Sequence, residues 1–208
     1  MMISLLGRSL RAALSALWLL GGALAFAQKA AKPVLVVFET ELGNFTVAVD
    51  AARAPITSAN FLKYVDGKCY DGGIIDRAVR PDNTRRHDAE IQVIQAQMNL
   101  THLGDVLPPI PLERTTATGL KHLDGSLSMA RGDPDTATAS FFVCIGDQPA
   151  LDFGGKRNPD GQGFAAFGRV VSGMDVVKKI QASPTGTKGN FGTETLDPPI
   201  HILKAHRL

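Results

Sequence analysis

The stretch SFFVCIG, residues 140–146, gives the strongest strand signal in the sequence and decides the fold class. It is a continuous apolar run of strand length that ends at a glycine. Because successive side chains of a strand point to opposite faces, Phe141 and Phe142 cannot both point inward. We therefore expect one of these rings to fill a core and the other to lie on the outer face of a sheet.

Other short segments of the chain also read as strands. They are residues 34–40, 44–50, 73–79, 91–97, 126–130, 164–171 and 199–208. One helix is predicted to begin at Pro55 and end at Gly67, and a second to be opened by Ser172 and Asp175, which have capping-box spacing. About eight short strands with Gly and Pro turns predict an antiparallel barrel or sandwich.

The first 27 residues have the features of a secretory signal. Arg8 and Arg11 precede an apolar run that ends in the small-residue pattern before Ala27. The run is shorter than the roughly 20 residues that a membrane span needs. We expect cleavage after Ala27, a single domain over residues 28–208, periplasmic or secreted localisation, and no stable membrane insertion. An uncleaved N-terminal anchor is the alternative.

Charge, cysteine and histidine content limit which partners, disulfides and metal sites the sequence predicts. The chain has 22 basic and 20 acidic residues, and loss of Arg8 and Arg11 would leave 20 of each. A neutral domain is a poor electrostatic match for nucleic acid, so we expect no nucleic-acid partner. Cys69 and Cys144 are predicted to be separate buried thiols, although an oxidising compartment would permit a disulfide. The histidines lack ligand spacing, so we expect no metal and no cofactor.

A series of segments in fixed order carries a family resemblance. The segments are ANFLKYVDG (59–67), YDGGIIDRAV (70–79), VIQAQ (93–97), SLSMAR (126–131), SFFVCIGDQPALD (140–152) and GFAAFGRVVSGMDVVKKI (163–180). Together they resemble the cyclophilin-type peptidyl-prolyl cis-trans isomerases, and in particular a bacterial exported branch. The resemblance implies a closed eight-stranded antiparallel barrel capped by two α-helices. It also implies a prolyl isomerase that acts on proline-containing polypeptides and assists the folding of exported proteins; we expect a monomer.

The resemblance also assigns the site. Arg77 corresponds to the catalytic arginine, Gln95 to the glutamine that orients it, and Phe142 to the floor of the proline pocket. The substrate-binding positions are Val93, Ala130, Arg131, Ser140, Leu151 and Phe164. Without the resemblance, Arg77 would be interpreted as a surface arginine paired with Asp76, and Phe142 as a core aromatic.

Several positions depart from the family pattern and keep alternatives open. The differences lie at Ile75, Asp76, Gln92, Val93, Ala96, Gln97, Ala150 and Phe164, and the only tryptophan, Trp18, lies in the signal. Loss of aromatic walls favours a catalytically weak proline-peptide binding module or chaperone as the alternative function. A ligand-carrying barrel is a third possibility, but Phe45, Phe141 and Phe167 are expected to fill the interior.

The segment RPDNTRRHDAE, residues 80–90, is longer than the usual link of the family at this point. It follows the strand that carries Arg77. If it overhangs the site, Arg80, Arg85 and Arg86 would favour acidic substrates. The alternative is a solvated loop with no role in binding.

Overall fold

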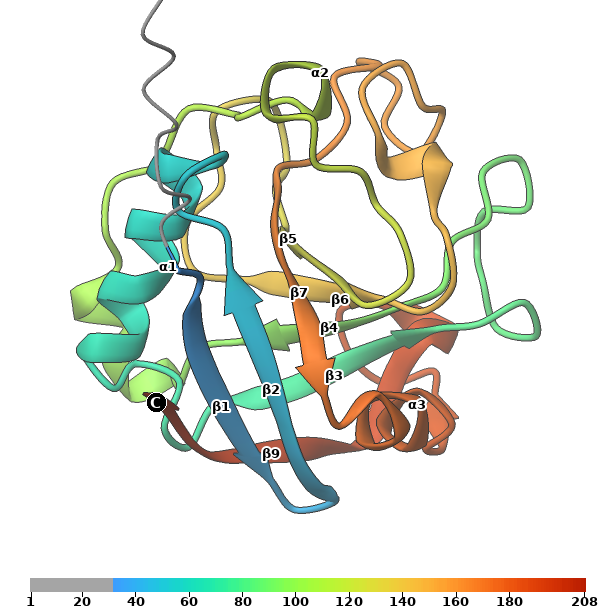
Figure 1. The fold of residues 1–208 in the computed structure, drawn as a ribbon. Coiled ribbons are helices and arrows are strands. Elements are labelled where there is room, and N and C mark those ends of the chain that lie inside the picture. The colour runs from blue at the N-terminus through green and yellow to red at the C-terminus, as the bar shows by residue number, and fades with distance from the viewer. Residues whose placement is uncertain (1–31) are drawn as a thin grey trace, which may run out of the picture.

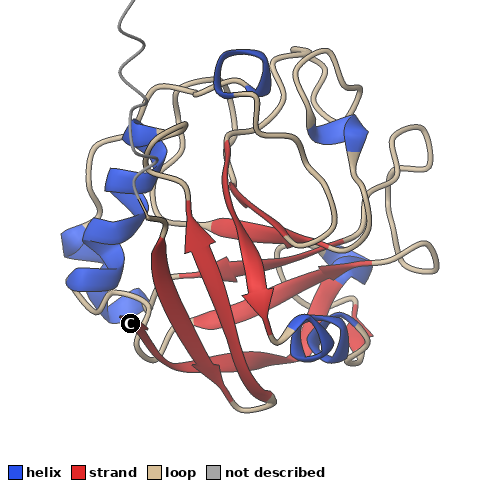
Figure 2. Ribbon diagram, in the orientation of Figure 1, coloured by secondary structure: helices blue, strands red, loops and turns tan. Residues whose placement is uncertain are grey.

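Residues 32–208 are described by a computed structural model, in which eight strands close into an antiparallel barrel (Figure 1, Figure 2). The strands are β1 (Val34–Thr40), β2 (Gly43–Val49), β3 (Ile74–Val79), β4 (Val93–Gln97), β5 (Ser126–Met129), β6 (Phe141–Cys144), β7 (Ala166–Ser172) and β9 (Thr195–Arg207). Their order is β1-β2-β7-β5-β6-β4-β3-β9, and β9 pairs with β1 to close the ring. A short strand, β8 (Thr185–Gly186), pairs with β9. The closed barrel confirms one of the two predicted architectures and excludes the sandwich.

Both predicted helices are present, and they lie on opposite sides of the barrel in Figure 1. They are α1 (Pro55–Asp66) and α3 (Met174–Gln181), and Pro55 occupies the first turn of α1 as expected. Shorter helical turns, which the sequence did not predict, are η1 (Leu100–Asp105), α2 (Thr115–Thr118), η2 (Pro149–Leu151) and η3 (Gly192–Glu194).

The predicted capping box at the start of α3 is wrong. Gly173 is the N-cap residue, with φ of 81°, and no side chain caps the helix. A Cβ at this position would lie 2.4 Å from the carbonyl oxygen of Asn44. The close passage of α3 over β2 therefore requires glycine at the helix start, and this tertiary constraint replaces local capping by Ser172.

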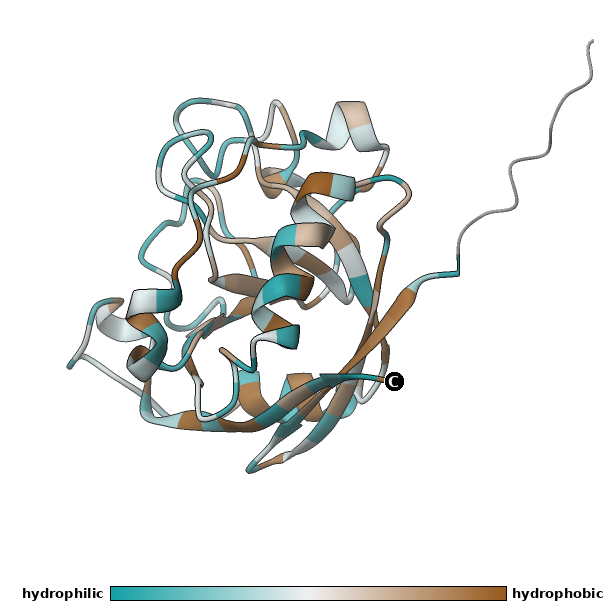
Figure 3. Ribbon diagram, turned by 90° about the vertical axis from the view of Figure 1, so that its left-hand side faces the viewer, coloured by the Kyte–Doolittle hydropathy of each residue, from teal (hydrophilic) through white to brown (hydrophobic). Residues whose placement is uncertain are grey.

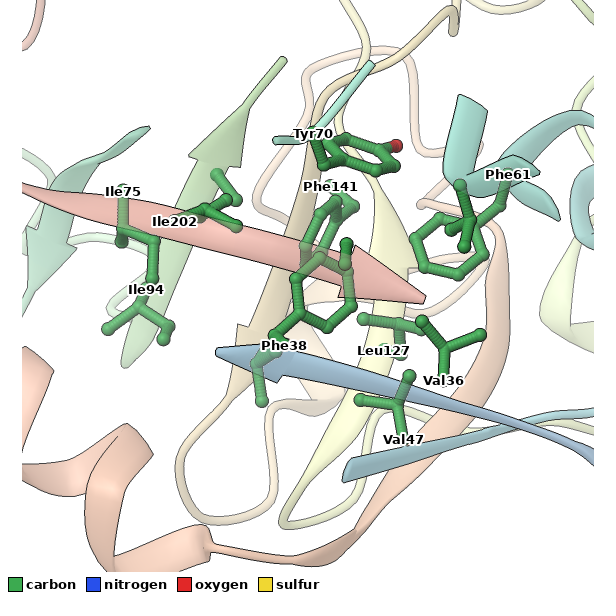
Figure 4. Close-up of a cluster of buried hydrophobic side chains, with 14 of the residues drawn as sticks. Val36, Phe38, Val47, Phe61, Tyr70, Ile75, Ile94, Leu127, Phe141 and Ile202 are labelled. Carbon is green, nitrogen blue, oxygen red and sulfur yellow. The ribbon is translucent and has the colours of Figure 1, made fainter. Parts of the chain in front are cut away.

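Aromatic rings fill the barrel (Figure 4). Phe141 lies with its ring centroid 5.1 Å from Phe38, 5.5 Å from Phe61 and 5.3 Å from Tyr70. Phe45, Phe141 and Phe167 are all fully buried, as predicted. Hydrophobic and hydrophilic residues are mixed along α1, as a helix with one buried face requires (Figure 3). Because these rings fill the interior, nothing in the barrel supports the third hypothesis, that it carries a ligand.

Strand β6 faces two apolar clusters at once. Phe141 belongs to the barrel core, whereas Phe142 belongs to a second cluster on the outer face of the sheet. The other buried members of that outer cluster are Val79, Ile91, Val93, Cys144, Leu151 and Phe164. The expectation that only one of the two rings points inward is confirmed.

A β-bulge in β3 sets the direction of Arg77. Ile75 pairs with Ala96 and Arg77 pairs with Gln95, so Asp76 is an extra residue between them. Ile75 is fully buried in the barrel core. In a regular strand, residues two apart share a face, so Arg77 would point into the barrel beside Ile75. The single inserted residue turns the guanidinium to the outer face.

The predicted signal, residues 1–27, lies outside the described residues. No helix within residues 32–208 has the length and apolar character needed to cross a membrane. Cys69 and Cys144 are both buried and unbridged, and they belong to different apolar clusters. The prediction of two separate thiols is confirmed.

Replacing Phe141 by alanine is expected to lower the free energy of unfolding by about 3–5 kcal/mol, because it opens a cavity among rings that cannot collapse into it. Val171→Ala is the control, since Val171 is 47% exposed, and its effect should stay within about 0.5 kcal/mol. Urea unfolding followed by circular dichroism measures both. Equal effects of the two substitutions would contradict the assigned core.

Candidate active site

A cleft of ≈ 320 Å³ lies on the outer face of β3, β4 and β6. Its lining residues are Arg77, Arg86, Ile91, Val93, Gln95, Ala130, Arg131, Phe142, Leu151, Arg157, Asn158, Phe164 and Phe191. Every sequence-predicted site residue except Ser140 is in this set. The cleft therefore brings together positions that are spread over some 90 residues of sequence.

The floor of the cleft is apolar and rigidly packed. Phe142 meets Phe164 edge to face, with ring centroids 5.4 Å apart at 90°. Val93 and Leu151 are buried against the same rings. Strand pairing of β4 with β6 sets Val93 opposite Cys144 and Gln95 opposite Phe142, so the sheet fixes the spacing of the floor. These four residues, Val93, Phe142, Leu151 and Phe164, form an apolar slot in the floor of the cleft.

A buried histidine supports this floor from behind. His122 stacks on Phe142 with ring centroids 6.0 Å apart. Its Nδ1 lies 2.8 Å from Asp152 Oδ1 and its Nε2 lies 2.9 Å from Ser128 Oγ. Burial pushes the pKa of Asp152 upward, but the hydrogen bonds from His122 outweigh this and hold it below its usual range. Both ring nitrogens of His122 therefore have partners, and its position under Phe142 could not be read from sequence spacing.

Arg77 is held on three sides at the edge of the slot. Its Nη1 donates to Gln95 Oε1 at 2.9 Å. Its Nε and Nη2 donate to Glu194 Oε2 at 2.9 and 2.7 Å. The ring of Phe191 stacks against the guanidinium, with the ring centroid 4.9 Å from Arg77 Cζ. These contacts fix the plane of the group before any substrate arrives.

The held guanidinium still has donors to offer. An arginine side chain carries five N–H groups. Its bonds to Gln95 and Glu194 engage Nε and one hydrogen on each terminal nitrogen, so each terminal nitrogen keeps one N–H. The side chain of Arg77 is 15% exposed and lines the cleft. Arg77 is therefore a fixed cation with free donors beside an apolar slot.

Glu194 was missed by the sequence interpretation. Its carboxylate is fully buried, and it also accepts from the backbone N–H of Arg85 at 3.0 Å. Burial pushes the pKa of Glu194 upward, but the Arg85 hydrogen bond and the charge of Arg77 outweigh it and lower the pKa below its ordinary value. The residue lies 117 positions from Arg77, at the end of a Gly- and Thr-rich segment without periodicity. No local pattern could have paired the two.

Asp76 is not the partner of Arg77. As the bulge residue it is half-buried, and its Oδ1 is buried without a hydrogen-bond partner. Burial raises the pKa of Asp76 from 3.8 to about 6, against the opposing effects of a Gln97 hydrogen bond and the Arg77 charge. The interpretation of Arg77 as an arginine paired with its sequence neighbour is wrong, because its guanidinium is bound to Gln95 and Glu194 instead.

The residues at the other end of the site are bonded mainly to one another. Ser140 donates to Gln97 Oε1 and accepts, through its carbonyl, from the backbone N–H of Ala130 at 2.9 Å. Ser140 lies outside the cleft lining. Arg131 lies over the Phe164 ring at 5.1 Å and is bound to Asp160 by bonds of 2.8 and 3.0 Å.

The loop of residues 80–90 packs onto the protein, and of its three arginines only Arg86 lines the cleft. Arg86 lines the cleft and donates to the Arg157 carbonyl at 2.7 Å. Arg80 instead donates to the carbonyl oxygens of Gln181 and Ser183 after α3. Arg80 therefore does not take the role that an overhanging loop would give it, because the unpaired carbonyls at the helix end bind it. Arg157, which contributes to the same wall, was missed.

One cluster outside the cleft carries metal-ligand chemistry. Cys69, His102 and Asp105 place ligand atoms within 4.8 Å of one another, a proximity that the sequence spacing did not indicate. Burial, followed by the charges of Asp105 and Asp71, raises the pKa of the Cys69 thiol, so the thiolate is disfavoured. His102 and Asp105 are bonded to each other at 2.8 Å. None of these residues lines the cleft.

Comparison with known proteins identifies the class to which this barrel belongs. The family described as cyclophilin type peptidyl-prolyl cis-trans isomerase matches residues 35–207. A peptidyl-prolyl cis-trans isomerase of Acinetobacter baylyi is 34% identical over 171 residues, 82% of this chain and 83% of that protein. Peptidyl-prolyl cis-trans isomerase A of Dickeya dadantii is 32% identical over 157 residues, 75% of each chain. The chain belongs to the cyclophilin-type peptidyl-prolyl cis-trans isomerases.

The fold also agrees with solved structures. A cyclophilin type peptidyl-prolyl cis-trans isomerase of Cryptosporidium parvum, solved in the presence of the dipeptide Ala-Pro, has a TM-score of 0.65 to this chain. The match covers 84% of this chain and 98% of that one at 18% sequence identity. At this identity the likeness bears on the barrel alone.

Glu194→Gln is expected to lower the free energy of unfolding at pH 7 by about 3 kcal/mol, because it leaves the Arg77 charge without its buried partner. The folded pKa of Glu194 lies below its ordinary value. Its stabilisation is thus complete above the unfolded value and is lost as pH falls through the folded one. The difference between wild type and variant should therefore shrink below about pH 4.

Asp66→Asn is the matched control, since Asp66 pairs with Arg207 at an exposed position. Its cost should stay below about 1 kcal/mol. Urea unfolding at several pH values tests both substitutions. A loss for Glu194→Gln no larger than that of the control would show that the buried pair does not hold the site.

Asp76→Asn is expected to stabilise the protein at pH 8 by up to about 3 kcal/mol, the value of a two-unit pKa difference. The folded pKa of about 6 exceeds the ordinary 3.8, so the folded state disfavours the ionised carboxylate. The cost is full above about pH 6 and disappears as pH falls toward the unfolded value. Unfolding of both proteins between pH 4 and pH 8 measures it; a difference independent of pH would contradict the raised pKa.

Proposed function

We propose that this protein accelerates cis–trans exchange of X–Pro bonds by donating a hydrogen bond from Arg77 to the proline nitrogen in the twisted state. The observation that carries the proposal is the fixed Arg77 guanidinium, with free N–H groups, beside the slot floored by Phe142.

The chemistry of the reaction suits such a group. The barrier to rotation is the amide resonance energy, roughly 18–20 kcal/mol. At the top of the barrier the conjugation is lost, the proline nitrogen becomes pyramidal, and its lone pair can accept a hydrogen bond. In either planar state that lone pair is delocalised. A donor aimed at the nitrogen therefore binds the twisted state better than the substrate or the product, which lowers the barrier.

The other residues of the cleft would position the proline ring and the Arg77 guanidinium. The slot of Val93, Phe142, Leu151 and Phe164 would hold the proline ring by burial of apolar surface. Gln95 and Glu194 hold the plane of Arg77, so the donor needs no reorganisation during rotation. No bond is made or broken in the substrate, and the mechanism requires no proton transfer by the protein.

The biological setting is part of the proposal. We propose that residues 1–27 are a signal removed after Ala27, and that the protein is a periplasmic or secreted member of a bacterial exported branch. Its substrates would be proline-containing segments of exported chains during folding, and it would act as a monomer. The support is the arrangement of Arg8, Arg11 and the apolar run ahead of Ala27.

A proline-peptide binding module or chaperone with weak catalysis is the second candidate. Glu194 favours it, because a carboxylate that accepts from Nε and Nη2 reduces the positive potential that Arg77 can direct at substrate. The described chain also lacks a tryptophan at the slot, which weakens binding of the proline ring. The two candidates differ in whether rotation is accelerated, not in whether peptide binds.

Arg77→Ala is expected to lower kcat/KM for a short X–Pro peptide by about 100-fold, which corresponds to the loss of one well-aimed donor of about 2.7 kcal/mol. Arg77→Lys should recover only part of this, because an ammonium cannot keep the planar contacts to Gln95 and Glu194. NMR exchange spectroscopy on residues 28–208 measures the rate directly.

Arg53→Ala is the control, since Arg53 pairs with Asp50 at an exposed position and does not line the cleft. It should retain the wild-type rate. Peptide binding by the wild-type protein without any exchange above the uncatalysed rate would sink the enzymatic proposal and leave the binding module.

A further inference from the structure

The walls of the cleft carry an excess of positive charge. Four arginines line it, namely Arg77, Arg86, Arg131 and Arg157, and no carboxylate does. The acids that pair with three of them, Glu194, Asp88 and Asp160, lie outside the lining. The electrostatic potential inside the cleft is therefore positive, because the guanidinium groups face it and the paired carboxylates do not line it.

Arg157 is the member of this set without an acidic partner. It is only 9% exposed, and its one side-chain hydrogen bond goes from Nη1 to the carbonyl of Ala89 at 3.0 Å. Among residues 32–208, no carboxylate oxygen lies within 4.0 Å of its nitrogens. Burial, followed by repulsion from Arg77, lowers the pKa of Arg157, and the more distant charge of Glu194 opposes this shift without cancelling it. A buried guanidinium beside other guanidiniums is costly unless an anion reaches it.

The surrounding structure holds this cation in place. Arg86 donates from Nη1 to the carbonyl of Arg157 at 2.7 Å, while Arg157 donates to Ala89. The two bonds join the loop of residues 80–90 to the segment of residues 153–163 across one end of the cleft. Neither bond uses a charged acceptor. Arg86 is also paired with Asp88, by bonds of 3.1 and 2.6 Å, whereas Arg157 has no such acid among the described residues, so the charge of Arg157 is the one that remains without a direct partner.

The direction of β4 indicates which part of a bound peptide would lie at the end of the cleft that carries Arg86 and Arg157. Gln95 stands beside the Arg77 donor, and Val93, further back along the strand, lies in the floor of the proline slot. With the proline nitrogen at Arg77 and its ring toward Val93, the chain after the proline continues toward Ile91. Ile91 lines the cleft together with Arg86 and Arg157, and Arg157 donates to the carbonyl of Ala89, two residues before Ile91. The residue before the proline extends the other way, toward Gln97 and Ser140.

We infer that Arg157 and Arg86 form an anion subsite for an acidic side chain located just after the proline of the substrate. This inference rests on the proposed function and names its preferred substrate class: X–Pro segments followed by Asp or Glu. The carboxylate supplies the counter-charge that Arg157 lacks in the protein itself. Arg80, which binds the end of α3, has no part in it.

The test compares isomerisation of blocked peptides of equal length by NMR exchange spectroscopy. The sequence Gly-Ala-Pro-X-Ala carries Glu, Gln or Lys at X, and a fourth peptide, Gly-Glu-Pro-Gln-Ala, moves the acid to the other side of the proline. A charge-assisted hydrogen bond to a partly buried cation predicts that kcat/KM for Glu at X exceeds that for Gln by about tenfold, with Lys below both. Raising salt from roughly 20 mM to about 0.5 M should reduce the advantage by screening.

Variants assign the effect to the named residues. Arg157→Gln and, independently, the more exposed Arg86→Gln should each reduce the Glu-to-Gln ratio to about twofold or less. Arg53→Gln, outside the cleft, should keep the full ratio. Circular dichroism shows whether each variant is folded, and Arg86→Gln carries the test if Arg157→Gln is not.

The outcomes separate this inference from the proposed function. If the Gln peptide is accelerated but Glu at X gives no advantage, the anion subsite is overturned while the isomerase stands. The same holds if the acid helps only before the proline, or if the ratio survives both substitutions. If no peptide is accelerated at all, the proposed function itself fails.

Discussion

The candidate site depends on one extra residue in β3. Asp76 is a bulge between Ile75, which packs into the barrel, and Arg77, which pairs with Gln95 on the outer face. A strand without it would send the guanidinium into an interior filled by aromatic rings, where no partner could offset its burial. The bulge is itself costly, since it leaves Asp76 half-buried with one oxygen unpartnered. The fold thus accepts a local penalty in order to present a cation outside the core.

Once outside, the cation is restrained by contacts from distant parts of the chain. Gln95 is its neighbour across β3 and β4, whereas Glu194 and Phe191 come from the segment before β9. Burial of Glu194 makes this pair expensive to break and keeps the guanidinium plane fixed. The arrangement balances two demands: more acceptors around Arg77 improve its orientation, but each reduces the charge and the donors left for a ligand. In this arrangement Arg77 keeps two N–H groups free for a ligand.

The barrel gives the slot its rigidity. Strand β6 places Phe141 in the core and Phe142 in the cleft, so the same backbone that closes the barrel also supports the floor of the site. His122 then braces Phe142 from behind through Asp152 and Ser128. A floor built on paired strands cannot shift without loss of core packing. The walls, in contrast, include Arg86 and Arg157, which come from loops.

The sequence alone determined what depends on local pattern. Periodicity gave the strands and the two main helices, alternation gave the opposite directions of Phe141 and Phe142, and the order of short motifs located Arg77, Gln95 and Phe142. It missed the bulge, because a run such as GIIDRAV carries no mark of its register against neighbouring strands. It also missed Glu194, His122 and Arg157, since each acts on a residue far away in the chain. Only the tertiary structure decided the partners, burial and charge balance of the site, because these are properties of surroundings that the closed barrel assembles and no sequence window contains.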